Sequence, residues 1–290
     1  METVRNYLKL TKPGVMAGNV LTAIAGYFLA TADYGFDWLI FVGMLGGMVL
    51  VVGGACALNN YLDRDIDAKM TRTKKRPSVS AGLSPTGMQV FAYGITIFGL
   101  AVLYFMTNVL TVVIGLIGFV TYVWLYGAWA KRKFAYGMAV GAIPGALPIA
   151  GGYAAASGQI DLGLVLVFLI ILFWQLPEFY SISIYRAKEY KAAGVPVFPI
   201  AKSVRSTITQ IVAGTTLYLA SALGLTFAGY TGMVYFVVIL IPGLIWLNLA
   251  FRGLSTGLHE VEVWARKMFK GAMYTILLVC LMLSIGAYLP

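Results

Sequence analysis

Residues 38–59 read WLIFVGMLGGMVLVVGGACALN, a run of apolar and small side chains without a single charged residue. Its length matches the roughly 20 residues that a helix needs to cross the hydrocarbon core of a bilayer. Because lipid offers no hydrogen bonds, a spanning segment must satisfy its own backbone, which only helices and closed barrels achieve. Barrel strands alternate polar and apolar side chains, and this run does not. The stretch therefore predicts a transmembrane helix.

Similar windows recur along the whole chain, which is 60% hydrophobic and only 11% charged, whereas soluble proteins carry about 25% charged residues. We therefore predict an all-α polytopic membrane protein that forms a single domain over residues 1–290. Its nine expected transmembrane helices are Val15–Ala32, Trp38–Asn59, Met88–Met106, Val109–Ala128, Tyr136–Ala156, Leu162–Ile184, Ile208–Gly229, Met233–Phe251 and Phe269–Leu289.

The basic residues fix the expected orientation. Of the 21 Lys and Arg residues, 20 fall in the N-terminal segment or in the connections after the second, fourth, sixth and eighth predicted helices, and Lys270 lies at the start of the ninth predicted helix, next to the last of these connections. The positive-inside rule places these segments in the cytoplasm. The N-terminus is then cytoplasmic and Pro290 is external. Because topology accounts for the net charge of +10, the composition gives no reason to expect a nucleic-acid partner.

The end of the second predicted helix carries the strongest chemical pattern, NNYLDRDID over 59–67. If the helix continues, Asn59, Asp63 and Asp67 line one face, since they recur every four residues at about 100° per residue. Mg²⁺ binds such oxygen ligands and usually adds phosphate oxygens to one or two carboxylates. Basic side chains that could neutralise a phosphate follow directly, namely Arg72, Lys74, Lys75 and Arg76. The pattern indicates a Mg²⁺–diphosphate site, while solvated charges at a helix end remain the alternative.

A second pattern, WQLPEFY over 174–180, places Glu178 inside a predicted span. An ionisable residue there is costly and by default suggests a function. Pro177 is expected to break or kink the helix just before it. If the helix continues, Tyr185 and Glu189 lie on the same face as Glu178. The alternative is that Glu178 lies near the membrane interface and pairs with a neighbouring Lys or Arg.

The third pattern, YGAWAKR over 126–132, combines aromatic and basic residues at a cytoplasmic boundary. Alone it is typical of the residues that anchor a helix at the membrane surface. The only histidine, His259, lies in the last cytoplasmic connection, where a solvated side chain is the simplest interpretation.

Together these patterns resemble the UbiA-type intramembrane prenyltransferases, and most closely their heme O synthase (protoheme IX farnesyltransferase) branch. The resemblance covers nearly the whole chain. It is carried by LTKPG at 10–14, NN at 59–60, DRDID at 63–67, RP at 76–77, WQLP at 174–177, GVP at 194–196 and WARK at 264–267. Two positions depart from the family pattern. Glu178 stands where the family has histidine, so this chain has no histidine at that position to contact heme. Glu189 stands where aspartate is common, which conserves the charge.

The resemblance implies a reaction and a site. Asn59, Asp63 and Asp67 would bind Mg²⁺ and, with Glu178 and Glu189, form the catalytic set. The implied diphosphate-binding residues are Arg72, Lys75, Arg76, Tyr126, Lys131, Arg132 and Arg186. The enzyme would transfer a farnesyl group from farnesyl diphosphate to a vinyl group of heme b within a lipid bilayer, expected to be a bacterial inner membrane.

Two other functions stay open at this point. A prenyltransferase that acts on an aromatic or quinone precursor would share the acidic motif. A transporter is the second possibility, but transporters place charged sites near the membrane midplane, whereas these acidic groups cluster at one surface.

Overall fold

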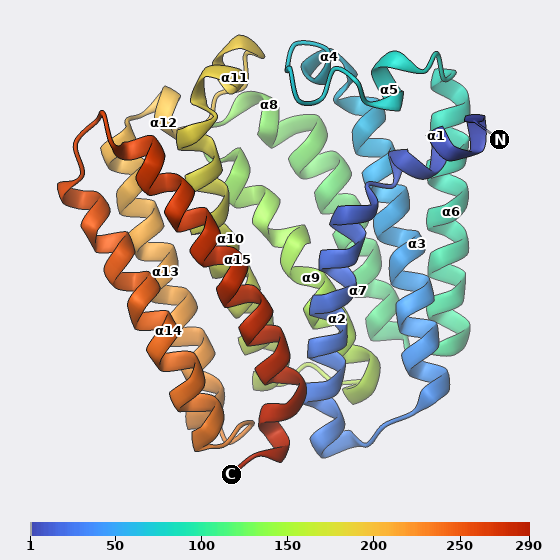
Figure 1. Cartoon of the computed structure of the whole chain (residues 1–290). Helices are drawn as coiled ribbons and strands as arrows, with labels where there is room; N and C mark the ends of the chain where they lie inside the picture. The colour runs from blue at the N-terminus through green and yellow to red at the C-terminus, as the bar shows by residue number, and fades with distance from the viewer. Residues whose placement is uncertain (1) are drawn as a thin grey trace.

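The computed structural model describes residues 2–290, and over that range the protein is built from helices (Figure 1). The described residues contain nine helices that are long and apolar enough to cross a membrane, which confirms the predicted number. They are α2 Pro13–Tyr34, α3 Trp38–Leu62, α6 Pro85–Met106, α7 Val109–Val120 with its continuation, α9 Gly137–Ser157, α10 Leu162–Tyr185, α13 Val204–Phe227, α14 Met233–Arg252 and α15 Val261–Ile285. The continuation of α7 is the π-helical segment η1, Thr121–Ala130, followed by α8, Lys131–Lys133.

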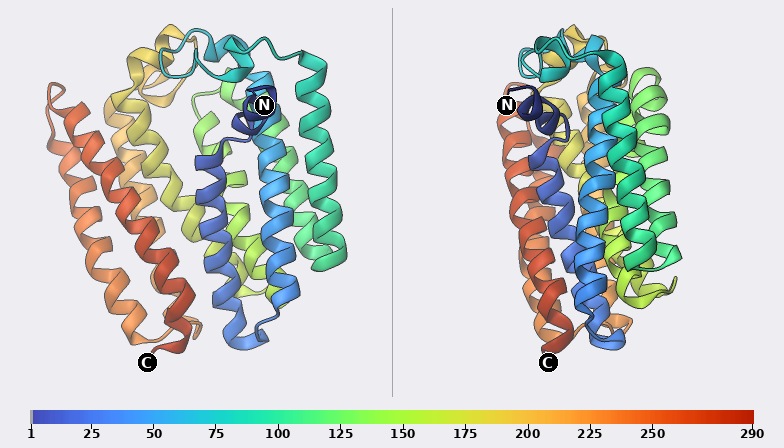
Figure 2. Two further views of the ribbon diagram at one scale, coloured as in Figure 1. Left: turned by 45° about the vertical axis from the view of Figure 1, so that its right-hand side comes forward. Right: turned by 90° about the vertical axis from the view of Figure 1, so that its right-hand side faces the viewer.

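Short helices form the connections. They are α1 Glu2–Leu10, α4 Arg64–Asp67, α5 Pro77–Ser80, α11 Ala187–Ala192, α12 Phe198–Ala201 and the 3-10 turns η2 Gly253–Ser255 and η3 Gly286–Tyr288. In Figure 1, α1, α4, α5, α8, α11 and α12 lie at one end of the bundle, and the C-terminus lies at the other. Figure 2 shows the same separation from two further directions. The basic connections therefore share one end of the molecule, as the alternation of charge predicts.

Two helices differ from the sequence-based expectation. Helix α15 begins at Val261 and not at Phe269, because its backbone stays helical through the basic residues that lower the hydropathy. Helix α10 continues through Pro177, so a break there is excluded, while a kink at this position stays a prediction. It ends instead at Tyr185, and α11 begins at Ala187. The continuous helix that was expected to align Glu178 with Glu189 is therefore interrupted.

Helices α2 and α9 pack closely because each has a glycine that lies against the backbone of the other helix. A Cβ atom at Gly26 would collide with the carbonyl oxygen of Ile149, and one at Gly152 with that of Ala23. Small residues at helix interfaces let backbones approach in this way within a membrane. This contact places the glycine- and proline-rich α9 in the middle of the bundle, beside α10.

The apolar core has two main parts. One joins α2, α9, α10, α13, α14 and α15, and the other joins α1, α3, α6, α7 and η1. Between them lies a cavity of about 740 Å³, lined from α2, α3, α7, η1, α9, α10 and α15. The bundle thus encloses a large, mainly apolar space.

Candidate functional site

The predicted acidic face forms across a change of helix. Helix α3 ends at Leu62, and Asp63 links it to α4 with φ −84° and ψ 4°. The amide of Asp63 still donates to the carbonyl of Asn59 at 2.9 Å, and that of Asp67 to the carbonyl of Asp63 at 2.8 Å. The four-residue spacing therefore survives the break. All three side chains are buried at the same place, as the sequence pattern predicts.

These residues line a polar pocket of about 160 Å³ at the end of the bundle that carries the basic connections. Its walls hold Asn59, Asp63, Asp67, Arg72, Arg76, Tyr126 and Lys131 from the predicted set. They also hold apolar residues and three further side chains that carry an ammonium or a hydroxyl group: Lys12, Tyr122 and Tyr190. The pocket therefore combines carboxylates, an amide and several cations in a small space.

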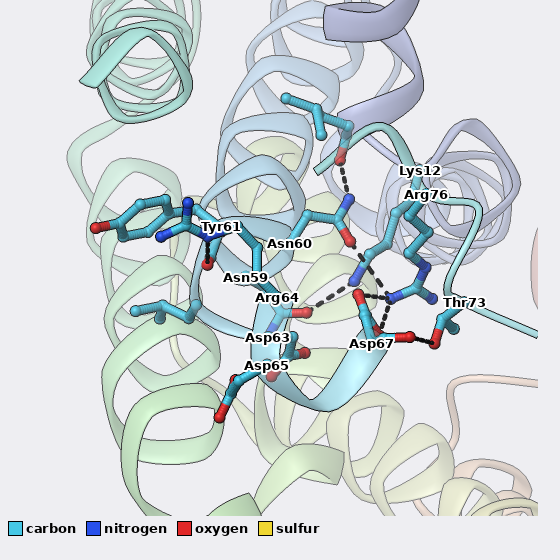
Figure 3. A network of polar contacts seen from close by, with 12 residues as sticks. Lys12, Asn59, Asn60, Tyr61, Asp63, Arg64, Asp65, Asp67, Thr73 and Arg76 are labelled. Atoms are coloured by element: carbon cyan, nitrogen blue, oxygen red, sulfur yellow. Dashed lines mark hydrogen bonds and ion pairs between the residues drawn. The ribbon is translucent and has the colours of Figure 1, made fainter. Parts of the chain in front are cut away.

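Both carboxylates of the pocket are paired with a cation. The Lys131 ammonium lies 2.6 Å from Oδ2 of Asp63. The Arg76 guanidinium donates to both carboxylate oxygens of Asp67, at 2.9 and 2.7 Å (Figure 3). Charge-assisted contacts of this kind are stronger than neutral hydrogen bonds. Lys131 comes from α8 and Arg76 from the turn before α5, so chain segments far apart in sequence meet here.

The side-chain oxygen of Asn59, the third predicted metal-binding residue, accepts a hydrogen bond from a residue of the N-terminal segment. The Lys12 ammonium donates to Oδ1 of Asn59 at 2.7 Å, and the Tyr122 hydroxyl lies 3.4 Å from the same oxygen. Loss of hydration in this protein environment lowers the pKa of Lys12 to about 8. Lys12 belongs to the TKPG stretch, but its approach to Asn59 is a tertiary contact that helical spacing could not reveal.

Arg132 is placed differently from its neighbour Lys131. Its guanidinium binds both oxygens of Asp65 at 2.7 and 2.8 Å and the carbonyl of Leu62 at 2.6 Å. This ion pair lowers the pKa of Asp65 to about 2. Figure 3 shows Asp65 pointing to the opposite side of the helix end from Arg76. Arg132 therefore lies next to the pocket without lining it.

Four more predicted residues lie outside the polar pocket. Arg186 pairs with Glu189 at 2.9 Å, and neither lines it. Lys75 is exposed on the connection after α4. Glu178 lines the larger apolar cavity instead. The structure thus separates Glu178 from the acidic residues of the α3–α4 junction.

Glu178 is unlike the polar residues that precede it on α10. The Trp174 indole donates to the carbonyl of Ala272 at 2.9 Å, and the Gln175 amide donates to that of Ala142 at 3.0 Å. The Glu178 carboxylate makes no hydrogen bond or ion pair within residues 2–290. A carboxylate without a protein partner therefore faces the apolar cavity.

The polar pocket suits Mg²⁺ that arrives with phosphate. Among the described residues, no three His, Cys, Asp or Glu side chains are grouped so that they could hold a metal alone. However, Oδ1 of Asp63 is buried without a hydrogen-bond partner, and the nearest Arg132 nitrogen is 4.0 Å away. Two carboxylates and an amide oxygen match the hard ligands that Mg²⁺ takes when phosphate supplies the others.

The polar pocket and the apolar cavity share a wall. Arg72, Tyr122 and Tyr126 line both spaces. The two tyrosine rings stack with centroids 5.9 Å apart on the π-helical segment η1. Such π-helical turns often occur at functional sites. A ligand with a charged head and a long apolar tail could therefore occupy both spaces at once.

Comparison with known proteins agrees with this geometry. Residues 19–274 match the UbiA prenyltransferase family. The chain is 40% identical to a protoheme IX farnesyltransferase of Chromohalobacter salexigens over 284 residues, which are 97% of this chain and 95% of the relative. It is 39% identical to a protoheme IX farnesyltransferase of a Marinomonas species, over 94% of this chain and 91% of that one.

Solved structures share the fold at low sequence identity. A digeranylgeranylglyceryl phosphate synthase superposes with a TM-score of 0.80 at 19% identity, covering 99% of both chains. A UbiA homologue from Archaeoglobus fulgidus bound to GPP and Mg²⁺ superposes with a TM-score of 0.69 at 14% identity, covering 93% of this chain and 99% of that one. The fold and the near full-length relatives confirm the resemblance seen in the sequence. The chain therefore belongs to the UbiA prenyltransferase family.

Proposed function

We propose that the chain transfers a farnesyl group from farnesyl diphosphate to a vinyl group of heme b and requires Mg²⁺. Its family makes it a membrane-embedded prenyltransferase. One observation supports the substrates most directly: a polar pocket with two buried carboxylates lies beside an apolar cavity of about 740 Å³, and Tyr122 and Tyr126 line both. The relatives named protoheme IX farnesyltransferase support heme as the acceptor.

The polar pocket would activate the leaving group. Asn59, Asp63 and Asp67 would hold Mg²⁺, and the metal would supply positive charge that stabilises the diphosphate leaving group. Arg76 and Lys131 would turn from their carboxylates towards phosphate oxygens, since both already line the pocket. The diphosphate leaves with the bonding electron pair, and an allylic cation remains.

The shared wall would protect the cation until the acceptor attacks. The faces of Tyr122 and Tyr126 can stabilise positive charge, and the apolar cavity excludes bulk water. The vinyl π electrons then form the new C–C bond, which moves the positive charge to the carbon next to the porphyrin. One water molecule adds there and loses a proton, so the product carries a hydroxyl group and a farnesyl chain.

The decisive assay uses purified protein with heme b, farnesyl diphosphate and Mg²⁺, followed by mass spectrometry. We expect a product with the mass of heme b plus farnesyl and hydroxyl groups. Parallel reactions contain geranylgeranyl diphosphate as donor, or 4-hydroxybenzoate as acceptor. Prenylation of 4-hydroxybenzoate without any reaction of heme b would refute the heme assignment and favour the quinone-precursor alternative.

We also propose that the end bearing the polar pocket faces the cytoplasm of a bacterial inner membrane. The motivation is the placement of every basic connection at that end. Cysteines introduced at exposed Lys202 and Gln159 probe opposite ends, while the native Cys56 and Cys280 are buried. In intact cells we expect an impermeant maleimide to label Gln159→Cys only. Labelling of Lys202→Cys alone would reverse the orientation.

A further inference from the structure

Lys12 reaches the pocket through an unusual backbone conformation. It links α1 to α2 with φ 53° and ψ 71°, and it is the only non-glycine residue with positive φ within residues 2–290. Left-handed conformations are unfavourable for a side-chain-bearing residue, and Pro13 restricts Lys12 further. Residues held in such conformations cluster at functional sites.

The backbone next to Lys12, between α1 and α2, is hydrogen-bonded to helix α3, which leads into the acidic motif. The buried Asn60 side chain donates to the carbonyl of Leu10 at 2.7 Å. On the other side of Lys12, the amide of Val15 donates to the Lys12 carbonyl at 2.8 Å. These contacts hold the Lys12 backbone in place, so that a change of partner would require only its long side chain to move.

Within residues 2–290 the Lys12 ammonium has no carboxylate partner, whereas two neighbouring cations of the pocket have one. Lys131 pairs with Asp63, and Arg76 pairs with Asp67. Lys12 contacts the neutral amide oxygen of Asn59, and no ion pair among the described residues includes it. A partly buried ammonium with only a neutral partner gains most from an anion, because charged contacts are stronger than neutral ones.

The atom that Lys12 contacts is the amide oxygen proposed to bind Mg²⁺. An ammonium and a metal ion cannot share that oxygen at close range, since both are cations. Mg²⁺ binding must therefore displace Lys12, whose fixed backbone keeps the ammonium beside the pocket. The diphosphate that accompanies Mg²⁺ would bring new negative charge into the pocket, while Asp63 and Asp67 would be engaged as ligands of the metal.

We propose that Lys12 is a switching cation. It holds the Asn59 oxygen in the metal-free enzyme and moves to the diphosphate when Mg²⁺ takes its place. This inference rests on the proposed function, because it requires Asn59 to be a metal ligand. It adds that Mg²⁺ and diphosphate bind cooperatively. Mg²⁺ alone binds weakly because it must displace Lys12, whereas with diphosphate present the displaced Lys12 gains a contact with phosphate.

The test measures binding and not turnover. Calorimetry on the purified protein determines the affinity for Mg²⁺ alone, and for inorganic diphosphate at saturating Mg²⁺. For Lys12→Met we expect diphosphate to bind roughly ten- to hundredfold more weakly. We expect Mg²⁺ alone to bind at least as tightly as to the wild type, because its competitor is gone. Opposite effects on the two ligands distinguish a switch from general damage.

Three variants separate charge from backbone strain. Lys12→Gly relieves the left-handed conformation and should weaken diphosphate binding as Lys12→Met does, whereas Lys12→Arg should retain most of it. Lys9→Met removes an exposed lysine of α1 and should change neither affinity. Unchanged diphosphate affinity in Lys12→Met and Lys12→Gly would overturn the switch while leaving the proposed function intact. If the wild type bound no Mg²⁺–diphosphate, the proposed function and the switch would both be wrong.

Discussion

Replacement of either Asp63 or Asp67 by asparagine is expected to lower farnesyl transfer by at least about a hundredfold. Both side chains are buried in the polar pocket, with 1% and 2% of their surface exposed. Asparagine keeps the shape but removes the negative charge that a Mg²⁺–diphosphate complex requires. The loss is therefore expected in turnover and in diphosphate affinity, while the protein still inserts and elutes as a single species.

Asp65 provides a matched control on the same turn. Its side chain is 61% exposed and pairs with Arg132 outside the pocket. Exposed ion pairs contribute only about 0–1 kcal/mol, so Asp65→Asn should retain activity within roughly twofold of the wild type. Steady-state rates of the three variants, with and without EDTA, decide the matter. Near-normal turnover of Asp63→Asn and Asp67→Asn, or wild-type activity that persists in EDTA, would rule out the proposed metal role.

The sequence predicts the helices better than it predicts their ends. Hydropathy identifies all nine spans because lipid imposes one simple requirement on every segment. It misses the start of α15, since Arg266 and Lys267 lower the hydropathy of residues that remain helical. It places the end of α10 within one residue, at Ile184, but it does not reveal the turn between Tyr185 and α11.

Local spacing explains which part of the site the sequence could predict. Asn59, Asp63 and Asp67 come together because a four-residue repeat survives the turn between α3 and α4. The partners of these residues depend on tertiary contacts. Lys12 meets Asn59 across 47 positions, and Arg132 is drawn away from the pocket by Asp65. The directions in which the long side chains of Lys12 and Arg132 extend cannot be predicted from the spacing of residues alone.

The role of Glu178 in the apolar cavity needs a separate explanation, because its carboxylate lines that cavity without a protein partner. Diphosphate binding is disfavoured for Glu178 because the lining of the polar pocket does not include it. Iron coordination is disfavoured by chemistry, since heme iron usually takes imidazole or sulfur ligands from a protein. We propose that Glu178 instead accepts the proton from the water that adds to the reacting vinyl group.

We therefore predict that Glu178→Gln lowers formation of the hydroxylated product by about a hundredfold, a typical contribution of general base catalysis. Binding of heme b and of farnesyl diphosphate should be nearly unchanged, because glutamine has the same size. Without a base, the cation beside the porphyrin can instead lose a proton, and mass spectrometry would detect a farnesylated product that lacks the elements of water. Glu262→Gln, on the exposed face of α15, is the control for a general change in charge.

Glu178→His tests the same residue from the opposite direction. Histidine can bind iron and can also accept a proton, so a spectral shift of bound heme would report a new iron ligand that the wild type lacks. If wild-type and Glu178→His spectra agree, the side chain at this position does not reach the iron in either protein. If Glu178→Gln abolishes heme affinity while farnesyl diphosphate still binds normally, Glu178 is a heme-binding residue, and its role as a proton acceptor is wrong. The two variants thus separate a carboxylate that moves a proton from one that holds the acceptor.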